Sequence, residues 1–483
     1  MKKPFFLTLV LLSVLLFSCN DKKGSEKGEN ESSGVKAETS DFEAVEIASS
    51  LPFGTHFPTD SSLINSWVAK SSVTEDLESN ENIIQHGWAI WHGLTAMTDQ
   101  TNNDQSLRVF ETWYTPGDII NANRARFANE NASLQSVGRK HTGTLETPNQ
   151  LEHGSIHTDD ADVVSFVKYN PAAAEFAFEH EVFFESTLKA LIEKGKIKDI
   201  PNFPNGAITL KPVFQLLSNS IGEGDYALNA WQGEEGNNNT TKSPNFKVTV
   251  SLNKESDPSN LIFNIKDFIH FKIDSAQAEF EGGKVGDYVV LVGMHVTTRE
   301  IKRWTWQTFW WSTYPDSPHR PSNSHIASIR EGATLDRAAA HYAMAIAYNM
   351  VIPTQPYYRK DVKDPSFANA QSIYAYNPHL EAGFNQAEFN DTTGSRSTGG
   401  YPYFEEYNYP LTVGGKKNDW GMQTNCMSCH GQARYNGKDT KHRYIADAYF
   451  GLDDKYFIGT VKTDFAWSIL GNLTTKEATS DKQ

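Results

Sequence analysis

The chain has 483 residues and a formal net charge of −15, with 59 acidic against 44 basic side chains. An acidic chain without a cluster of Lys and Arg lacks the contacts that release counterions from a phosphate backbone, which excludes nucleic acid as the expected partner. Aromatic residues make up 12% of the chain, and disordered chains are poor in them, so most of this chain is expected to fold. At this length a single hydrophobic core usually stops growing, and two or more packed units are expected.

The N-terminus has the pattern of an export signal. Lys2 and Lys3 precede an apolar run over residues 5–17, which is shorter than the roughly 20 residues that cross a bilayer. The letters LFSC at residues 16–19 resemble the lipobox of bacterial lipoproteins, in which the signal is cut before a cysteine whose thiol is lipidated. This resemblance implies lipidation of Cys19. An ordinary signal peptide with an incidental cysteine is the alternative.

Residues 20–41 are polar, charged and rich in Gly and Ser, which is the composition of a flexible spacer. A lipid anchor followed by such a spacer predicts an exported protein that is held at a membrane and faces the periplasm or the cell surface. The chain is therefore expected to consist of a signal peptide (residues 1–18), a lipidated Cys with its linker (19–42), a folded body (43–410), a small C-terminal module (411–470) and a frayed tail (471–483).

Two of the three cysteines fall in the sequence CMSCH, which holds Cys426, Cys429 and His430. This is the C-x-x-C-H pattern of covalent haem attachment, in which two thiols one helical turn apart add to the haem vinyl groups and the adjacent imidazole binds the iron. The alternatives are a plain disulfide, a zinc site, which would need two more ligands at matching spacing, and a redox pair, which would be expected near a βαβ pattern. The motif predicts one covalent haem c with His430 as the proximal iron ligand.

The segment over residues 419–465 resembles a c-type cytochrome module, and the chain is similar to exported mono-haem cytochrome c proteins of bacteria. The resemblance implies electron transfer outside the cytoplasm with a redox partner protein. Small cytochromes c usually take their sixth iron ligand from a Met downstream of the motif, yet no Met follows Met427 here. The sixth position is then open or weakly held, or it is filled by another residue. The candidates are His442 and Met294, with His295 and Met344 as further upstream residues.

The body over residues 43–410 has mixed periodicity and is expected to be α+β, with a β-rich centre, packed helices and the small helical haem module at its C-terminal end. Runs of β-branched and apolar residues predict strands over residues 257–270, 286–298 and 304–311. A proline-initiated stretch and an alanine-rich stretch predict helices over residues 171–193 and 335–350.

Two aromatic stretches in the body raise the alternative of a small-molecule cleft. They supply His86, Trp88, Trp91 and His92, and then Glu111, Trp113 and Tyr114. Trp and His at such spacing are more often satisfied core or interface residues, so the core interpretation is favoured. A later loop carries Asp316, His319 and His325 without the spacing of a nucleophile, metal or phosphate motif. The absence of nucleotide-binding and hydrolase motifs disfavours a nicotinamide, ATP or flavin enzyme.

Three hypotheses for function follow. An electron carrier needs only the haem motif, with the body forming a docking surface for the redox partner. A haem-dependent or haem-coupled oxidoreductase would use the large body to bind a substrate, and its haem would accept electrons or activate peroxide. A surface lipoprotein whose cleft captures a small molecule is the third. A firmly six-coordinate haem favours the first hypothesis and an open sixth position favours the second.

Overall fold

The structure is a computed structural model of the chain. It describes residues 57–74, 77–102, 105–129, 131–136, 163–230, 246–273, 283–318, 321–330, 334–348, 358–359, 375–381, 407–408, 412–413, 416–417, 426–437 and 452–476. The chain divides into two units, residues 1–39 and residues 40–483, and all described residues belong to the second unit. The predicted signal peptide, Cys19 and the whole predicted linker lie outside the described residues. Within the described ranges, no helix combines the length and the apolar character needed to cross a membrane.

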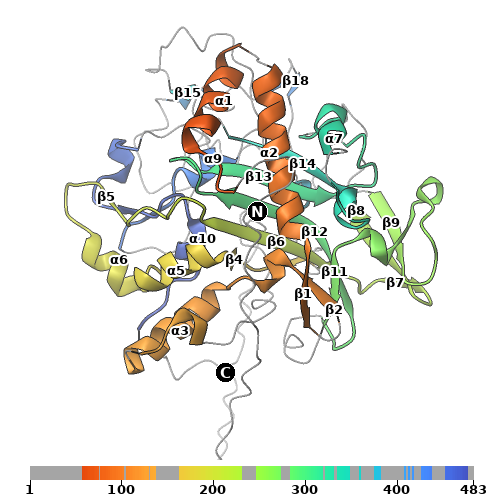
Figure 1. Ribbon diagram of the computed structural model, residues 1–483, viewed down its shortest axis with the longest axis horizontal. Coiled ribbons are helices and arrows are strands. Elements are labelled where there is room, and N and C mark those ends of the chain that lie inside the picture. Colours follow the sequence, from red (N-terminus) through yellow and green to blue (C-terminus); the bar gives the residue numbers. More distant parts are fainter. Residues whose placement is uncertain are drawn as a thin grey trace, which may run out of the picture. The chain divides into compact units, whose positions relative to one another are not determined.

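A seven-stranded antiparallel sheet forms the centre of the fold (Figure 1). β12 (Tyr288–Thr298) lies in its middle, because β6 (Ile208–Leu216) pairs with one edge of β12 and β13 (Thr305–Trp311) with the other. β14 (Tyr342–Ile346) extends the sheet beyond β13. The short strands that complete it are β3 (Val163–Ser165), β4 (Lys168–Tyr169) and β11 (His270–Lys272). β-branched and aromatic residues, which favour strands, dominate β12 and β13.

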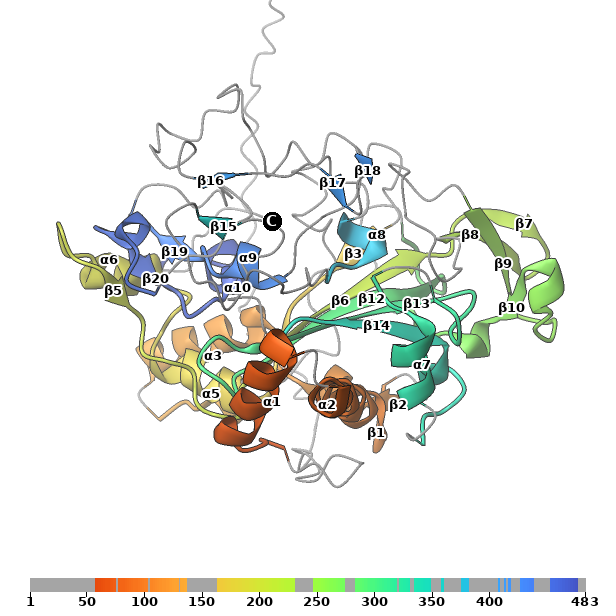
Figure 2. The same cartoon turned by 90° about the horizontal axis from the view of Figure 1, so that it is seen from above.

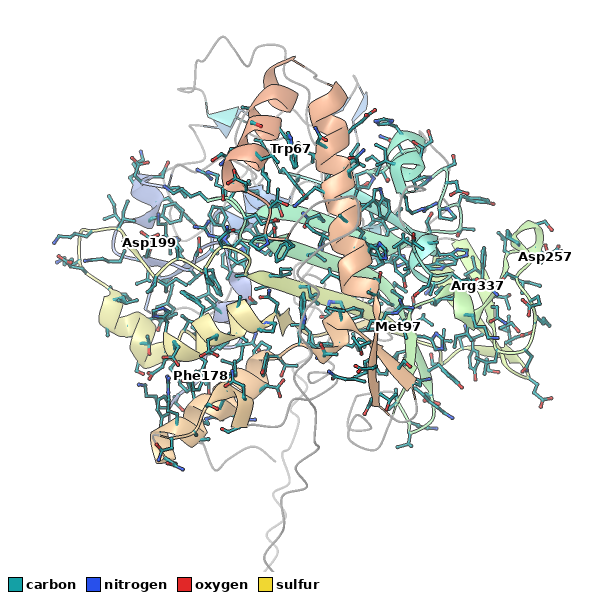
Figure 3. All side chains as sticks on the ribbon, in the orientation of Figure 1. Trp67, Met97, Phe178, Asp199, Asp257 and Arg337 are labelled. Atoms are coloured by element: carbon teal, nitrogen blue, oxygen red, sulfur yellow. The ribbon has the colours of Figure 1, made fainter. Side chains whose placement is uncertain are left out.

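One face of this sheet packs against helix α2 (Leu77–Thr95), and we call it the α2 face. The rings of Trp91 and Phe309 stack there with their centroids 4.4 Å apart. Side chains alternate along a strand, so the sheet residues that share this face with Phe309 are Trp311, Met294 and Met344. Helices α1 (Ser61–Thr74) and α7 (Ser324–Arg330) pack beside α2. Figure 3 labels Trp67 of α1, whose ring lies 6.2 Å from that of His86 on α2.

The opposite face of the sheet packs against C-terminal segments, and we call it the α9 face after helix α9 (Cys426–His430). The α9 face carries Trp306, Trp310, Ala343 and Ala345, which lie in one hydrophobic cluster with Met427 of α9. Figure 2 shows α2 on one side of the sheet and α8 (Pro378–Glu381) with α9 on the other. The sheet therefore separates the long helix α2 from the C-x-x-C-H motif.

Further helices and a small sheet pack around the end of the sheet that lies near α9. The helices are α3 (Pro116–Ala128), α5 (Pro171–Glu179), α6 (Glu185–Leu191) and α10 (Trp467–Gly471). Local capping explains two of these starts, since the side chains of Thr115 and Asn170 accept backbone N–H groups at α3 and α5. The small sheet joins β5 (Lys198–Asp199), β20 (Val461–Lys462) and β19 (Arg434–Tyr435), so C-terminal strands pair with the body.

Peripheral strands form smaller sheets. A four-stranded sheet is built from β7 (Ser220–Gly222), β8 (Asp225–Ala230), β9 (Phe246–Ser251) and β10 (Ile262–Asn264). The two-stranded pairs are β1 (Met97–Asn102) with β2 (Gln105–Arg108), β15 (Tyr358–Arg359) with β16 (Tyr407–Asn408), and β17 (Thr412–Val413) with β18 (Lys416–Lys417). The β-rich centre with helices packed around it confirms the mixed α and β fold. The cytochrome c-like module stays a prediction, and its boundary between residues 410 and 411 lies outside the described residues.

The helix predicted over residues 335–350 is wrong. A single 3-10 turn over Ala339–His341 is followed by β14, which pairs with β13 from Gln307 and Ile346 to Trp311 and Tyr342. The edge of β13 offers backbone partners, and this tertiary pairing outweighs the helix propensity of alanine. The small alanine side chains of β14 also fit beside the bulky tryptophans of β13 on the α9 face.

Of the other predicted elements, two strands are confirmed, one helix is interrupted and one strand is replaced by other structure. The strands predicted over residues 286–298 and 304–311 are confirmed as β12 and β13. The helix predicted over residues 171–193 is interrupted between α5 and α6, where Glu181 adopts a left-handed backbone with φ of 51°. The strand predicted over residues 257–270 is instead two 3-10 turns around the short strand β10. Thr474, predicted to belong to the frayed tail, exchanges backbone hydrogen bonds with the chain around Phe184.

A buried polar network joins α2 to the residues that follow β12 and β14. Glu300 Oε1 lies 3.2 Å from His86 Nε2, and Glu300 Oε2 accepts a hydrogen bond of 2.5 Å from the Thr298 hydroxyl. His86 Nδ1 lies 2.5 Å from the hydroxyl of Tyr348, to which Gln307 donates. Burial opposes ionisation of Glu300, but the His86 charge and these hydrogen bonds outweigh burial and hold the Glu300 pKa below its usual value. The network therefore stabilises the fold.

Replacing Glu300 by Ala should lower the free energy of unfolding by about 3–5 kcal/mol, because it leaves His86 and the bonded N–H and O–H groups buried without their acceptor. Urea denaturation of purified protein measures this loss. Glu179→Ala is the matched control, since the Glu179 side chain is 54% exposed and pairs only at the surface. Similar losses for both variants would contradict a structural role for the network.

Candidate functional site

Helix α9 places the residues of the C-x-x-C-H motif on one short helical segment. Positions three and four apart in a helix share a face, so Cys426 lies on the same side of α9 as Cys429 and His430. The side chain of Cys429 lies outside the part of the structure that can be described. The helix thus has the spacing that the C-x-x-C-H pattern requires.

The imidazole of His430 is oriented by two contacts. Its Nδ1 donates to the backbone carbonyl of Phe465 at 2.9 Å, and its ring centroid lies 4.4 Å from that of Trp306 on the α9 face. A carbonyl oxygen only accepts hydrogen bonds, so Nδ1 carries the proton and the neutral ring has its lone pair on Nε2. Histidines that bind metals commonly donate their other ring N–H to a carbonyl or carboxylate in this way. The tautomer suits an iron ligand.

The carbonyl that orients His430 belongs to a strained backbone segment. Asp464 and Phe465 both have positive φ, 47° and 69°, which for residues other than glycine costs on the order of 1–3 kcal/mol each. The carboxylate of Asp464 holds the segment, because it accepts hydrogen bonds from the Phe203 backbone N–H at 3.0 Å and from Arg299 Nε at 3.2 Å. Such strain is characteristic of functional positions, and here it presents an acceptor to His430.

The thiol of Cys426 is directed to the chain before α8. Its Sγ lies 3.5 Å from the Ala375 carbonyl, at the edge of the hydrophobic cluster on the α9 face. Burial raises the pKa of Cys426, and the nearby charge of Glu381 raises it further. The Cys426 thiol is therefore protonated at neutral pH, and the negative charge of Glu381 favours this protonated form.

Helix α8 is fixed on the α9 face by Asn377. The side-chain amide of Asn377 donates to Thr308 Oγ1 at 3.0 Å and to the Phe309 carbonyl at 2.9 Å. β12 has a glycine at this point, and a Cβ on Gly293 would lie only 2.5 Å from Asn377 Nδ2. Glu381 Oε2 accepts from the Asn377 backbone N–H at 2.6 Å, and Glu381 Oε1 lies 2.9 Å from His295 Nε2. Asn377 thus holds the carboxylate of Glu381 against the imidazole of His295 on β12.

The sheet separates the candidates for the sixth iron ligand. Met294 and Met344 are fully buried on the α2 face, so the structure does not bring either to His430, which lies on the α9 face. His295 is paired with Thr308 across β12 and β13, and its ring bonds Glu381 on the α9 face. His442 lies outside the described residues. Among the upstream candidates that the sequence offered, His295 alone shares a face with His430.

The aromatic stretches proposed as an alternative cleft are core. His86, Trp88 and Trp91 are each 0% exposed, and Trp113, Tyr114 and Glu111 are buried as well, whereas His92 is half-buried. The indole N–H groups of Trp88 and Trp91 donate to backbone carbonyls, and Lys168 Nζ donates to the carbonyls of Glu111 and Trp113. These contacts and this burial agree with the core interpretation, because Trp88, Trp91 and Trp113 lie in the hydrophobic cluster of the α2 face.

The loop candidates are not brought together. Asp316 pairs with Arg330, and its side chain is 85% exposed. His325 lies exposed on α7, and His319 lies outside the described residues. Where the structure can be described, it holds no group of three or more His, Cys, Asp or Glu side chains that could bind a metal ion.

Sequence reasoning missed Asn377, Glu381 and Phe465. None of them belongs to a motif, and each acts on a residue at least 35 positions away in the chain. No family model, curated protein or solved structure matches this chain. The site therefore has to be interpreted from its own geometry.

Replacing Gly293 by Ala should lower the free energy of unfolding by about 1–3 kcal/mol, because the new methyl group overlaps an Asn377 amide that is already bonded to β13. Urea denaturation gives the value. Gly117→Ala is the control, since the nearest atom to its Cβ would be 3.6 Å away. In an Asn377→Ala background the Gly293→Ala loss should shrink. An equal loss in both backgrounds would show that the clash does not exist.

Proposed function

We propose that this chain binds one haem c covalently through Cys426 and Cys429, with His430 as the proximal iron ligand, and transfers electrons outside the cytoplasm. The observation that carries the proposal is the 2.9 Å hydrogen bond from His430 Nδ1 to the Phe465 carbonyl, at the end of a helix that bears the whole C-x-x-C-H motif. Such a bond gives the imidazole the tautomer that an iron ligand needs.

The residues around the motif fit such a group. The strained backbone at Asp464 and Phe465 sets the direction of the His430 ring, and Trp306 fixes its tilt. The α9 face supplies apolar side chains that exclude water, and a less polar surrounding raises the reduction potential of a haem. The haem, when bound, supplies a one-electron couple between ferric and ferrous iron. The protein would orient the iron ligand His430 and keep solvent away from the haem.

The N-terminal pattern supports the location of this activity. Haem is attached to C-x-x-C-H motifs outside the cytoplasm, which agrees with the export signal and with a lipid on Cys19. The lipid anchor would hold the protein at a membrane, facing the periplasm or the cell surface. The redox partner would be a separate protein, and the net charge of −15 would speed association with a basic partner surface.

Substitution of the motif tests the haem proposal. After expression with haem-maturation machinery, the wild-type protein should keep a c-type optical spectrum through acid–acetone extraction, whereas Cys426→Ala/Cys429→Ala should lose it. His430→Ala should keep the covalent group but change its spin state, because the proximal imidazole is gone. Met427→Leu, within the same motif, is the matched control and should behave as wild type. Loss of the haem from the wild-type protein on acid–acetone extraction would refute the proposal.

Fractionation of cells tests the anchor. Wild-type protein should sediment with membranes and partition into detergent, and Cys19→Ser should block lipidation because the thiol that carries the lipid is absent. Metabolic labelling with a radioactive fatty acid gives the direct readout. Labelled Cys19→Ser protein, or unlabelled wild-type protein, would contradict lipidation at this residue.

A further inference from the structure

His295 and Glu381 form an ion-pair geometry on the face of the sheet that also carries His430. His295 Nε2 lies 2.9 Å from Glu381 Oε1, and a carboxylate accepts, so the ring donates from Nε2 and has its lone pair on Nδ1. The His295 side chain is 22% exposed, whereas that of Glu381 is 8% exposed. Among the described residues, Glu381 is the hydrogen-bond partner of the His295 ring. A histidine so oriented by a carboxylate can accept a proton at Nδ1.

The pair is held more firmly than a surface ion pair. Glu381 is fixed through its second oxygen by the Asn377 backbone, and Asn377 is itself bonded to β13 at two points. His295 lies in the middle of the sheet, between Thr308 of β13 and Lys211 of β6. This hydrogen-bond network needs a glycine at position 293, where a Cβ would overlap Asn377. It also needs the turn of helix α8, which carries Glu381.

The pair also lies beside the proposed haem site. Cys426, one of the two proposed attachment thiols, has its Sγ 3.5 Å from the carbonyl of Ala375, two residues before Asn377, whose backbone N–H binds Glu381. His430 contacts Trp306 on β13, and His295 is paired with Thr308, two residues further along that strand. His295 and His430 therefore lie over nearby positions of β13 on the same face of the sheet.

The number of haem motifs limits the substrate class. The chain has one C-x-x-C-H motif and three cysteines in all, so the proposed function provides one haem, which accepts one electron at a time. A donor suited to such an acceptor loses electrons singly and forms a radical that is stabilised by delocalisation. Phenols and hydroquinones have this property, and their oxidation releases a proton from oxygen together with each electron.

We propose that His295 and Glu381 form a proton-accepting pair for the one-electron oxidation of a phenol or hydroquinone by the haem, an inference that rests on the proposed function. The O–H bond of the substrate would break and its proton would bind Nδ1 of His295, while a haem held by Cys426, Cys429 and His430 would take up the one electron. The substrate leaves as a neutral oxygen-centred radical. Glu381 stabilises the imidazolium that forms, and both electron and proton then pass on, to the redox partner and to water.

Two electron donors separate proton acceptance from haem reduction. Ferric holoprotein is mixed in a stopped-flow instrument with 1,4-benzohydroquinone, which must lose a proton, or with ferrous EDTA, which loses an electron alone. His295→Gln should slow reduction by hydroquinone about 100-fold and leave reduction by ferrous EDTA within twofold of wild type. Glu381→Gln should slow the hydroquinone reaction about tenfold. Met294→Leu, the neighbour on the opposite face, should change neither rate.

A binding measurement supplies a readout that is independent of turnover. In ferrous holoprotein, which cannot oxidise phenol, added phenol should shift the Nδ1 signal of His295 in a proton–nitrogen correlation spectrum, and His295→Gln identifies that signal by its loss. The signal of the exposed His325 should not shift. Equal slowing of both donors by His295→Gln, or unchanged hydroquinone rates with no phenol shift, would overturn the proposal while leaving the haem itself intact. A protein without covalent haem would overturn the proposed function and this inference together.

The source of the hydroquinone can be distinguished in the same system. A hydroquinone with a long alkyl tail, embedded in phosphatidylcholine vesicles, should reduce lipidated full-length protein faster than Cys19→Ser protein if the substrate resides in a membrane. Equal rates, with faster reaction of the tail-less compound, would assign a soluble phenol. Either result retains His295 as the proton acceptor, provided that His295→Gln slows the preferred donor.

Discussion

The alternation of side chains along β12, β13 and β14 is the constraint on which the rest of the structure depends. Because adjacent residues point to opposite faces, Phe309 packs against α2 while its neighbour Trp310 packs on the α9 face. The α2 face is closed by a long helix and a buried polar network. The α9 face carries the motif helix and the pair formed by His295 and Glu381. A shift of register by one residue would exchange these surfaces and dismantle the site.

On the α9 face, two local features orient the side chains of the candidate site. The strained backbone at Asp464 and Phe465 offers a carbonyl to His430, and the contact of Asn377 with Gly293 fixes α8. The positive φ angles of Asp464 and Phe465 add free energy to the folded state that the surrounding hydrogen bonds must offset. The common effect of the two features is to orient two imidazoles on one surface, one as a candidate iron ligand and the other as a candidate proton acceptor.

The sequence was sufficient for features with strong local signals. β-branched and aromatic runs predicted β12 and β13, and the spacing of cysteine and histidine singled out α9. Alanine-rich β14 was predicted as a helix because its strand pairing depends on β13, which lies far away in the sequence. The choice between Met294 and His295 required knowledge of which face each residue occupies. Asn377 and Glu381 could not be found, since their roles come from contacts with residues on distant strands.

The mass of the denatured protein shows whether haem is covalently attached to the chain. Full-length wild-type chain and Cys426→Ala/Cys429→Ala would be produced with haem-maturation machinery, unfolded in acid and examined by intact mass spectrometry. The wild-type mass, after allowance for N-terminal processing, should exceed that of the polypeptide by one haem, and the double variant should lack this increment. A wild-type mass equal to that of the processed polypeptide alone would contradict covalent haem attachment and the function built on it.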